Sequence, residues 1–132
     1  MERVFVDTSA WFAFANRKDA AHGRVRDAMR SFPGKLVTSN FIFDETVSLC
    51  LYRLGHDAAR TAGSVLMNPE LVDLLRISSE DEQAAWRLFL QRSDHDFSFT
   101  DCTSFAIMRR LGLTNALALD DDFRAEGFMV ML

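Results

Sequence analysis

Short apolar runs alternate with longer segments of helical periodicity along this chain of 132 residues. Each short run is bounded by polar or turn-forming residues and has the length of a buried strand. We therefore expect strands over residues 4–6, 35–38, 71–77 and 116–119, and a candidate edge strand over residues 128–132.

The longer segments repeat apolar residues every three to four positions, which indicates helices. Helix starts are indicated by the cap candidates Ser39 or Asn40 and Asp57, and by capping-box patterns over residues 78–82 and 98–101. Gly55 indicates a helix end. The first predicted helix begins at residue 8 or 9. Four others cover 22–31, 41–53, 57–67 and 99–111, and another runs from about 79 to 92. A short last helix ends near residue 126.

Alternating strands and helices favour an α/β fold with a mostly parallel central sheet flanked by helices. The chain has the length of one domain and contains no linker, repeat or low-complexity segment. We therefore predict a single domain over residues 1–132.

Two predicted strands end in an acidic residue, Asp7 in the first case and Asp120 in the fourth. Ligands of open α/β sheets bind outside the carboxyl ends of the strands, so both acids are expected at a functional edge. Asp7 also suits a helix cap, and Asp121 and Asp122 suit the start of the last helix. A run of three acids exceeds what one cap requires, so we interpret this edge as a candidate site.

Two further acids lie on predicted helices. A helical wheel places Glu45 among Phe41 and Tyr52 on an apolar face, where a carboxylate is costly unless something pairs with it. A buried ion pair with an arginine is the structural alternative for Glu45. Asp101 lies in the first turn of its helix and forms a capping-box pattern with Ser98, a role that is compatible with binding a ligand.

Clustered carboxylates repel one another unless they are protonated or share a cation. Oxygen ligands without histidine or cysteine favour Mg²⁺ or Mn²⁺. Such ions activate water and stabilise charge during phosphodiester cleavage. We therefore expect a divalent metal site formed by Asp7, Glu45, Asp101 and Asp120.

Four segments carry these acids: Val-Asp-Thr-Ser at 6–9, Thr-Ser-Asn-Phe-Ile-Phe-Asp-Glu at 38–45, Phe-Ser-Phe-Thr-Asp-Cys at 97–102 and Leu-Asp-Asp-Asp-Phe at 119–123. In this order and spacing, the whole chain resembles a PIN domain, and specifically the VapC-type toxins of toxin–antitoxin pairs. The resemblance implies a PIN-like α/β/α sandwich and a Mg²⁺- or Mn²⁺-dependent ribonuclease. It implies metal-binding roles for Asp7, Glu45, Asp101 and Asp120, with Asp122 as a variable further position, and supporting polar roles for Thr8, Ser9 and Thr100.

The resemblance also implies partners: an RNA substrate, a VapB-like antitoxin and a second copy of the chain. A second apolar stripe on the 41–53 helix, made of Phe43, Val47, Cys50 and Leu51, is a candidate dimer interface unless the next helix covers it. For the antitoxin, we expect an amphipathic segment near Trp11 and Phe14 and a basic residue placed among the site acids.

Other functions fit parts of the pattern. A phospho-acceptor receiver domain needs a late lysine, and this chain has none after Lys35. A haloacid-dehalogenase-type phosphatase needs a second acid two residues after Asp7, where Ser9 stands. A non-toxin or binding-only PIN domain in RNA processing remains open.

Charge, hydrophobicity and cysteine content bear on the choice of substrate and on the location of the protein. The net charge of −4 counts against a phosphate-binding surface, but residues 17–35 carry six basic and two acidic residues, a net charge of +4. No apolar run approaches the ~18 residues of a membrane span, and the first strand follows Met1 so closely that we expect no signal peptide. Two cysteines without metal-type spacing suit a reducing cytoplasm.

Overall fold

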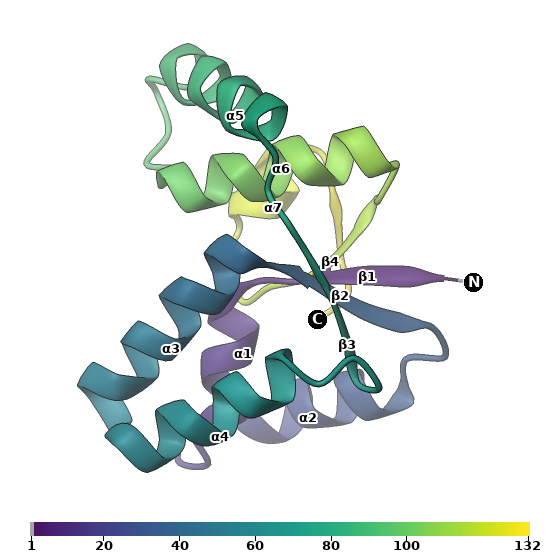
Figure 1. Ribbon diagram of the computed structural model, residues 1–132. Coiled ribbons are helices and arrows are strands. Elements are labelled where there is room, and N and C mark those ends of the chain that lie inside the picture. The colour runs from purple at the N-terminus through teal and green to yellow at the C-terminus, as the bar shows by residue number, and fades with distance from the viewer. Residues whose placement is uncertain (1) are drawn as a thin grey trace.

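A five-stranded parallel sheet forms the centre of the computed structural model, which describes residues 2–132 (Figure 1). Its strands are β1 Arg3–Val6, β2 Lys35–Ser39, β3 Val72–Leu75, β4 Asn115–Leu117 and β5 Met129–Val130. They lie in the order β3-β2-β1-β4-β5, and every neighbouring pair is parallel. The predicted α/β class with a parallel sheet is therefore confirmed.

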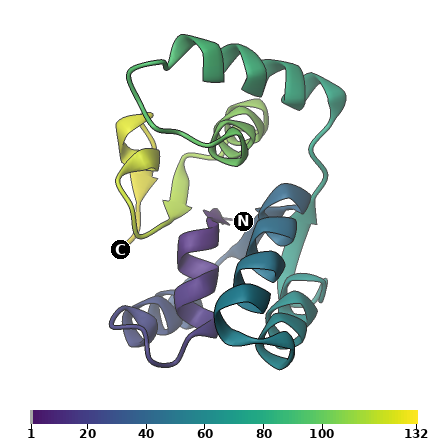
Figure 2. The ribbon, with the colours of Figure 1, turned by 90° about the vertical axis from the view of Figure 1, so that its left-hand side faces the viewer.

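The helices are α1 Thr8–Ala15, α2 His22–Ser31, α3 Asn40–Leu54, α4 His56–Leu66, α5 Ser79–Gln91, α6 Phe99–Leu111 and α7 Asp122–Ala125. The first four cover one face of the sheet and the last three cover the other face (Figure 1, Figure 2). This arrangement is an α/β/α sandwich. Within residues 2–132, no helix has the length and apolar character that a membrane span requires.

Most predicted boundaries lie within two residues of the observed ones, and the largest differences are at the sheet edges. β3 is shorter than the predicted 71–77 segment, and β5 is reduced to two residues. Asp57 was predicted to cap α4, but Gly55 occupies the N-cap position and makes no side-chain bond. Gly55 is the single residue between α3 and α4 and has φ of 102°, so the two helices meet without room for a polar cap.

The predicted second apolar stripe of α3 faces α4. Phe43 and Val47 contact the α4 backbone near Gly63, where an added Cβ would lie 3.2 Å from Val47 Cγ2. Cys50 is fully buried in a cluster with alanines of α4. Phe43 and Val47 remain half-buried, Leu51 is 41% exposed, and these side chains line an apolar groove between α3 and α4, so the interpretation of the stripe as a dimer interface stays a prediction.

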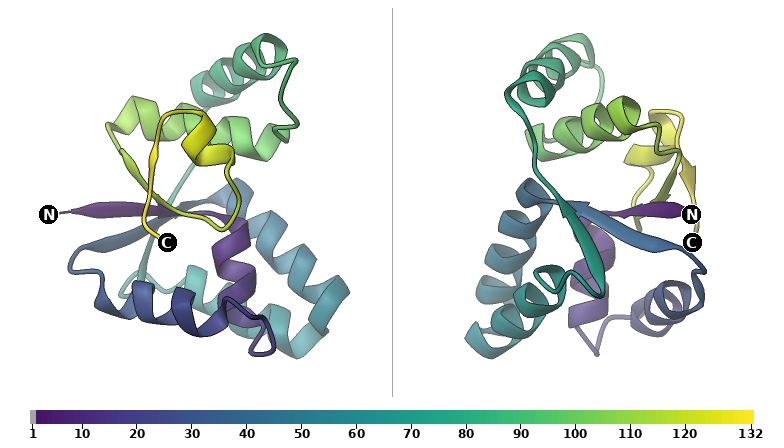
Figure 3. Two further views of the ribbon diagram at one scale, coloured as in Figure 1. Left: turned by 180° about the vertical axis from the view of Figure 1, so that it is seen from behind. Right: turned by 45° about the vertical axis from the view of Figure 1, so that its right-hand side comes forward.

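The chain changes direction across the sheet at β1. From β1 it proceeds to β2 and β3 on one side, then crosses the other face through α5 and α6 to reach β4 on the opposite side (Figure 3). The Asp7 N–H donates to the Leu117 carbonyl across 3.0 Å, so the carboxyl ends of β1 and β4 meet. Such a switch point is where open α/β sheets bind ligands.

Candidate active site

Asp7 ends β1 and is the N-cap of α1. Its Oδ2 accepts hydrogen bonds from the Ser9 backbone N–H at 3.2 Å and from Ser9 Oγ at 2.7 Å. The residue is only 4% exposed. The pKa of Asp7 is raised to about 7, mainly by burial; the hydrogen bonds from Ser9 act to lower it, and the negative charges of Asp101 and Asp120 contribute to the rise.

Ser9 joins the two strand ends that form this edge. Its hydroxyl donates to Asp7 and accepts from the Leu119 backbone N–H across 3.0 Å. The loop after β4 is thereby fixed next to the end of β1, which brings Asp120 towards Asp7. Thr8, the predicted supporting neighbour, is buried, and its Oγ1 has no hydrogen-bond partner among residues 2–132.

Asp101 reaches the same edge from the first turn of α6. It forms the predicted capping box with Ser98: the Ser98 N–H donates to Asp101 Oδ2 at 2.9 Å, and the Asp101 N–H donates to Ser98 Oγ at 3.0 Å. Burial raises the pKa of Asp101 to about 6, and the charges of Asp122 and Asp120 add to the rise. The capping box and the contribution to an acidic site therefore coexist, since the cap uses one carboxylate oxygen.

Two acids approach from the segment between β4 and α7. Asp120 Oδ1 accepts from the Asp122 N–H at 3.1 Å, which bends the chain into α7. Burial raises the pKa of Asp122, the charges of Asp120 and Asp121 raise it further, and the charge of His95 lowers it. Asp122 is therefore part of the same electrostatic cluster as Asp120.

The structure thus gathers carboxylates from β1, α6 and the β4–α7 segment at one edge. Within residues 2–132, however, no three acidic, histidine or cysteine side chains stand close enough to form a ready metal-binding group. Ser9 and Ser98 each bind one carboxylate oxygen and fix the side chains of Asp7 and Asp101 in place. The edge is an acidic cluster with an open geometry.

Glu45 differs from its prediction. The buried face of α3 carries Ile42, Thr46 and Cys50, whereas Tyr52 is 81% exposed. With ~100° per residue, Glu45 lies at the border of the buried face and is half-buried. Its expected position at the centre of an apolar face is therefore wrong, and it forms no ion pair with an arginine in the described part of the chain.

The α3 helix nevertheless begins beside α6. The rings of Phe41 in α3 and Phe99 in α6 lie 6.3 Å apart between centroids. Glu45 is one helical turn after Phe41, and Asp101 is two residues after Phe99. Glu45 is not among the main charges that raise the pKa of Asp7, Asp101 or Asp122. Thr100, half-buried beside Asp101, accepts bonds at its carbonyl from Thr103 at 2.6 Å and Ser104 at 3.2 Å.

His95 is a neighbour of the cluster that sequence reasoning missed. It lies in the loop between α5 and α6, which the sequence analysis did not associate with the site. Its ring stacks on Phe97 with centroids 4.6 Å apart, and its charge acts on Asp122. No spacing along the chain indicates this approach, because it depends on how the loop packs against α7.

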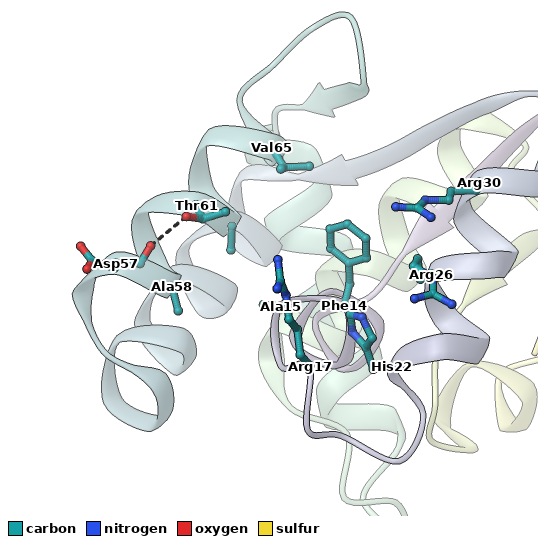
Figure 4. Close-up of a pocket in the computed structure, with 11 residues that line it drawn as sticks. Phe14, Ala15, Arg17, His22, Arg26, Arg30, Asp57, Ala58, Thr61 and Val65 are labelled. Atoms are coloured by element: carbon teal, nitrogen blue, oxygen red, sulfur yellow. Dashed lines mark hydrogen bonds between the residues drawn. The ribbon is translucent and has the colours of Figure 1, made fainter.

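A pocket of about 740 Å³ lies elsewhere, between α1, α2 and α4 (Figure 4). Phe14, Ala62 and Val65 supply apolar lining. Arginines of the basic segment surround them: Arg17, Arg26 and Arg30. Phe14, which we expect to contact an amphipathic segment of the antitoxin, therefore lines this pocket.

Trp11 does not line this pocket. It is 1% exposed, and its Nε1–H donates to Thr38 Oγ1 across 3.3 Å in the core. The expectation of an exposed apolar surface around Trp11 is therefore wrong.

A doubly wound parallel sheet with carboxylates at its switch point defines an α/β domain with an acidic site. The chain belongs to the PIN domain family, whose sequence profile matches residues 4–128. It is 39% identical to the 23S rRNA-specific endonuclease VapC20 of Mycobacterium tuberculosis over 126 residues, which cover 96% of this chain and 95% of the relative. The chain is thus a homologue of the VapC-type PIN ribonuclease toxins.

Solved structures agree with this assignment. The crystal structure of Mycobacterium tuberculosis VapC20, described as a sarcin–ricin loop cleaving toxin, matches with a TM-score of 0.91 and 38% identity, covering 96% of each chain. A toxin–antitoxin complex from Klebsiella pneumoniae shares the fold with a TM-score of 0.68 and 15% identity, covering 98% of this chain and 96% of the other. VapBC2 from Rickettsia felis, bound to a promoter DNA fragment, shares it with a TM-score of 0.71 and 7% identity, covering 98% and 97%.

Proposed function

We propose that this protein is a Mg²⁺- or Mn²⁺-dependent endoribonuclease, the toxin of a toxin–antitoxin pair. The observation that carries the proposal is the mutual influence of Asp7, Asp101 and Asp120, three carboxylates from separate elements at the switch point of the sheet. Like charges gathered at one edge repel one another without a cation, and an all-oxygen donor set suits Mg²⁺ or Mn²⁺.

The proposed ligands of the cation are Asp7, Glu45, Asp101, Asp120 and Asp122. When bound, the ion supplies water activation and charge stabilisation at the scissile phosphate. Ser9 fixes the Asp7 carboxylate through its 2.7 Å bond and ties it to the β4–α7 segment. Thr8 and Thr100, next to two of the acids, are the proposed polar supports of the site.

We propose ribosomal RNA as the substrate. The relative that shares 39% of its residues with this chain is named as a 23S rRNA-specific endonuclease. RNA targets of this kind are recognised at loops whose bases are accessible, rather than in regular duplex.

The test is cleavage of ribosomal RNA by purified protein in EDTA, Mg²⁺ and Mn²⁺. Asp7→Asn and Asp101→Asn keep the size of the side chain and an oxygen that accepts the cap bond, so both variants should fold and lose at least a hundredfold of the activity. Asp44→Asn, next to Glu45 but exposed, is the matched control and should retain full activity. Wild-type activity in both site variants contradicts the assignment, and RNA binding without cleavage by the wild type supports the binding-only alternative.

We further propose that a VapB-like antitoxin inhibits the protein through two contacts. One is a basic side chain placed among Asp7, Asp101 and Asp120, where a guanidinium pairs with carboxylates. The other is an amphipathic helix in the pocket between α1, α2 and α4, with apolar residues towards Phe14 and acidic residues towards Arg26 and Arg30.

Charge reversal tests the second contact. Arg26→Glu with Arg30→Glu should weaken antitoxin binding at least tenfold by calorimetry, because the introduced glutamates would repel the acidic residues of the amphipathic helix. Arg87→Glu on α5, an exposed arginine outside this pocket, is the control. Equal antitoxin affinity for wild type and the double variant would exclude this pocket as the docking site.

We also propose a homodimer and a cytoplasmic location. Large apolar side chains remain exposed on α5, where the rings of Trp86 and Phe89 stack with centroids 5.6 Å apart and Leu90 is 58% exposed. A second copy of the chain is the proposed occupant of this surface. The free and buried Cys50 and Cys102 suit a reducing compartment.

A further inference from the structure

Two buried hydroxyl groups lack a hydrogen-bond partner among residues 2–132: Thr8 Oγ1 and Thr46 Oγ1. Thr46 is fully buried, and Thr8 is 5% exposed. Buried polar groups are normally paired, and a valine would fill the same space without leaving a hydroxyl unpaired. These two exceptions therefore require an explanation.

Both threonines lie on helices that start at the acidic edge. Thr8 follows Asp7 at the start of α1, and Thr46 follows Glu45 in the first half of α3. Helical side chains tilt towards the amino terminus of their helix. The Thr46 side chain is therefore directed towards the end of the sheet that carries the carboxylates.

The two helices pack side by side and run in the same direction, because each follows the carboxyl end of one of two neighbouring parallel strands (Figure 1, Figure 2). Phe12 and Ala15 of α1 pack against the buried cluster that Cys50 of α3 forms with Ala59 and Ala62 of α4. One turn earlier on each helix stand Thr46 and Thr8. The parallel course of α1 and α3 thus brings both hydroxyls to one seam, directly behind the acids that precede them.

We propose that Thr46 is a positioning residue of the acidic site, which acts with Thr8 through a bridging water to hold Asp7 and the turn of α3 that carries Glu45. A bridging water needs two to four polar partners, and the two hydroxyls with an adjacent carboxylate supply them. Thr46 thereby links the acid on β1 to the acid on α3. This inference rests on the proposed function, since it gives Thr46 a task in the metal site.

The test compares Thr46→Val, which removes the hydroxyl and keeps the shape, with Thr46→Ser, which keeps the hydroxyl. The first readout is the rise in melting temperature when Mn²⁺ replaces EDTA, which reports cation binding without RNA. The second is the Mn²⁺ concentration that gives half-maximal RNA cleavage.

For Thr46→Val we expect a melting temperature in EDTA close to the wild-type value, because valine keeps the packing of the buried side chain and the loss of one hydrogen bond to water has a small net effect. We also expect a smaller Mn²⁺-induced rise and about a tenfold higher Mn²⁺ requirement, the usual effect of losing a group that orients a metal ligand. Thr46→Ser should restore both. Thr38→Val is the buried control: its hydroxyl bonds the Val6 carbonyl and Trp11, so this variant should melt lower in EDTA.

A double-mutant cycle tests the shared water. Thr8→Val and Thr46→Val should each weaken Mn²⁺ binding, and the double variant should add little to either one. A wild-type Mn²⁺ response in Thr46→Val, or in Thr46→Ala if the valine does not fold, overturns the inference. If the wild type binds Mn²⁺ and cleaves no RNA, the proposed function fails while the melting shifts still decide the role of Thr46.

Discussion

Single side chains at the acidic edge serve folding and the proposed chemistry together. Asp7 caps α1 and Asp101 completes the capping box of α6, and both are desolvated beside other acids. A capping carboxylate uses one oxygen for the backbone and keeps the other for a ligand. These residues can therefore act both as helix caps and as site residues. Their raised pKa values show that holding the ionised carboxylates together is unfavourable in free energy.

Those pKa values predict how the stability of the metal-free protein depends on pH. The pKa values of Asp7 and Asp101 rise from 3.8 to about 7 and about 6, so the folded protein holds these protons more tightly than the unfolded chain. Their stabilising contribution is complete below the unfolded pKa and is lost as pH rises through about 6 and 7. Thermal melts in EDTA should therefore show a falling melting temperature from about pH 5 to about pH 8.

The Asp7→Asn variant provides the check on this prediction. An asparagine does not titrate, so its melting temperature should fall less over the same pH range and exceed the wild-type value by several degrees at about pH 8. Asp44→Asn should follow the wild-type curve, because Asp44 is exposed. Parallel curves for wild type and Asp7→Asn would show that Asp7 is not the titrating group.

At the scale of elements, capping boxes fix α5 and α6, two of the three helices that cover the second face of the sheet. Ser78 and Asp81 close the start of α5, and Ser98 and Asp101 close the start of α6. The Arg110 guanidinium of α6 donates to both oxygens of Asp81, at 2.6 and 2.9 Å, and holds the pKa of that carboxyl below its usual value. This bidentate pair ties α5 to α6 and so supports the helix that presents Asp101.

We expect Asp81→Ala to lower the free energy of unfolding by about 2 kcal/mol at neutral pH: ~1 for the cap, and a similar amount for hydrogen bonds to an arginine that is half exposed. The depressed pKa places this stabilisation above the unfolded value of 3.8, so it disappears as pH falls below that value. Urea unfolding measures the effect. The control Asp57→Ala, which removes an exposed pair with Arg60 at 3.5 Å, should change little. Equal stability of the two variants would contradict a structural role for Asp81.

At the scale of the whole molecule, the order of the strands in the sheet determines where the acidic cluster lies. Because β1 lies between β2 and β4, the acids that follow β1 and β4 meet, while α3 and α6 start on opposite faces beside them. The apolar surface of α5 lies opposite the buried face that contacts α6. It is the proposed interface with a second copy of the chain.

The dimer prediction uses two side chains of nearly equal exposure. Leu90 on α5 is 58% exposed and Met67 after α4 is 57% exposed. Leu90→Glu should convert a dimer to a monomer in light scattering at tens of micromolar, because a charge enters an apolar interface, and Met67→Glu should leave the dimer intact. Circular dichroism confirms that both variants fold. A monomeric wild type, or dissociation by Met67→Glu alone, would reject the α5 surface.

The sequence by itself determined the features that depend on neighbouring residues. Strand runs, helix periodicity, the two capping boxes and the acids after β1 and β4 are local patterns, and the structure places them where the sequence predicted. Tertiary packing decided the rest: α4 buries Cys50 of the α3 stripe and leaves Leu51 exposed, Glu45 lies at a border rather than a buried centre, His95 approaches Asp122, and Thr46 is buried behind the site. Each of these depends on which distant segment lies against a given helix face, and a periodicity of 3.6 residues identifies a face without identifying its neighbour.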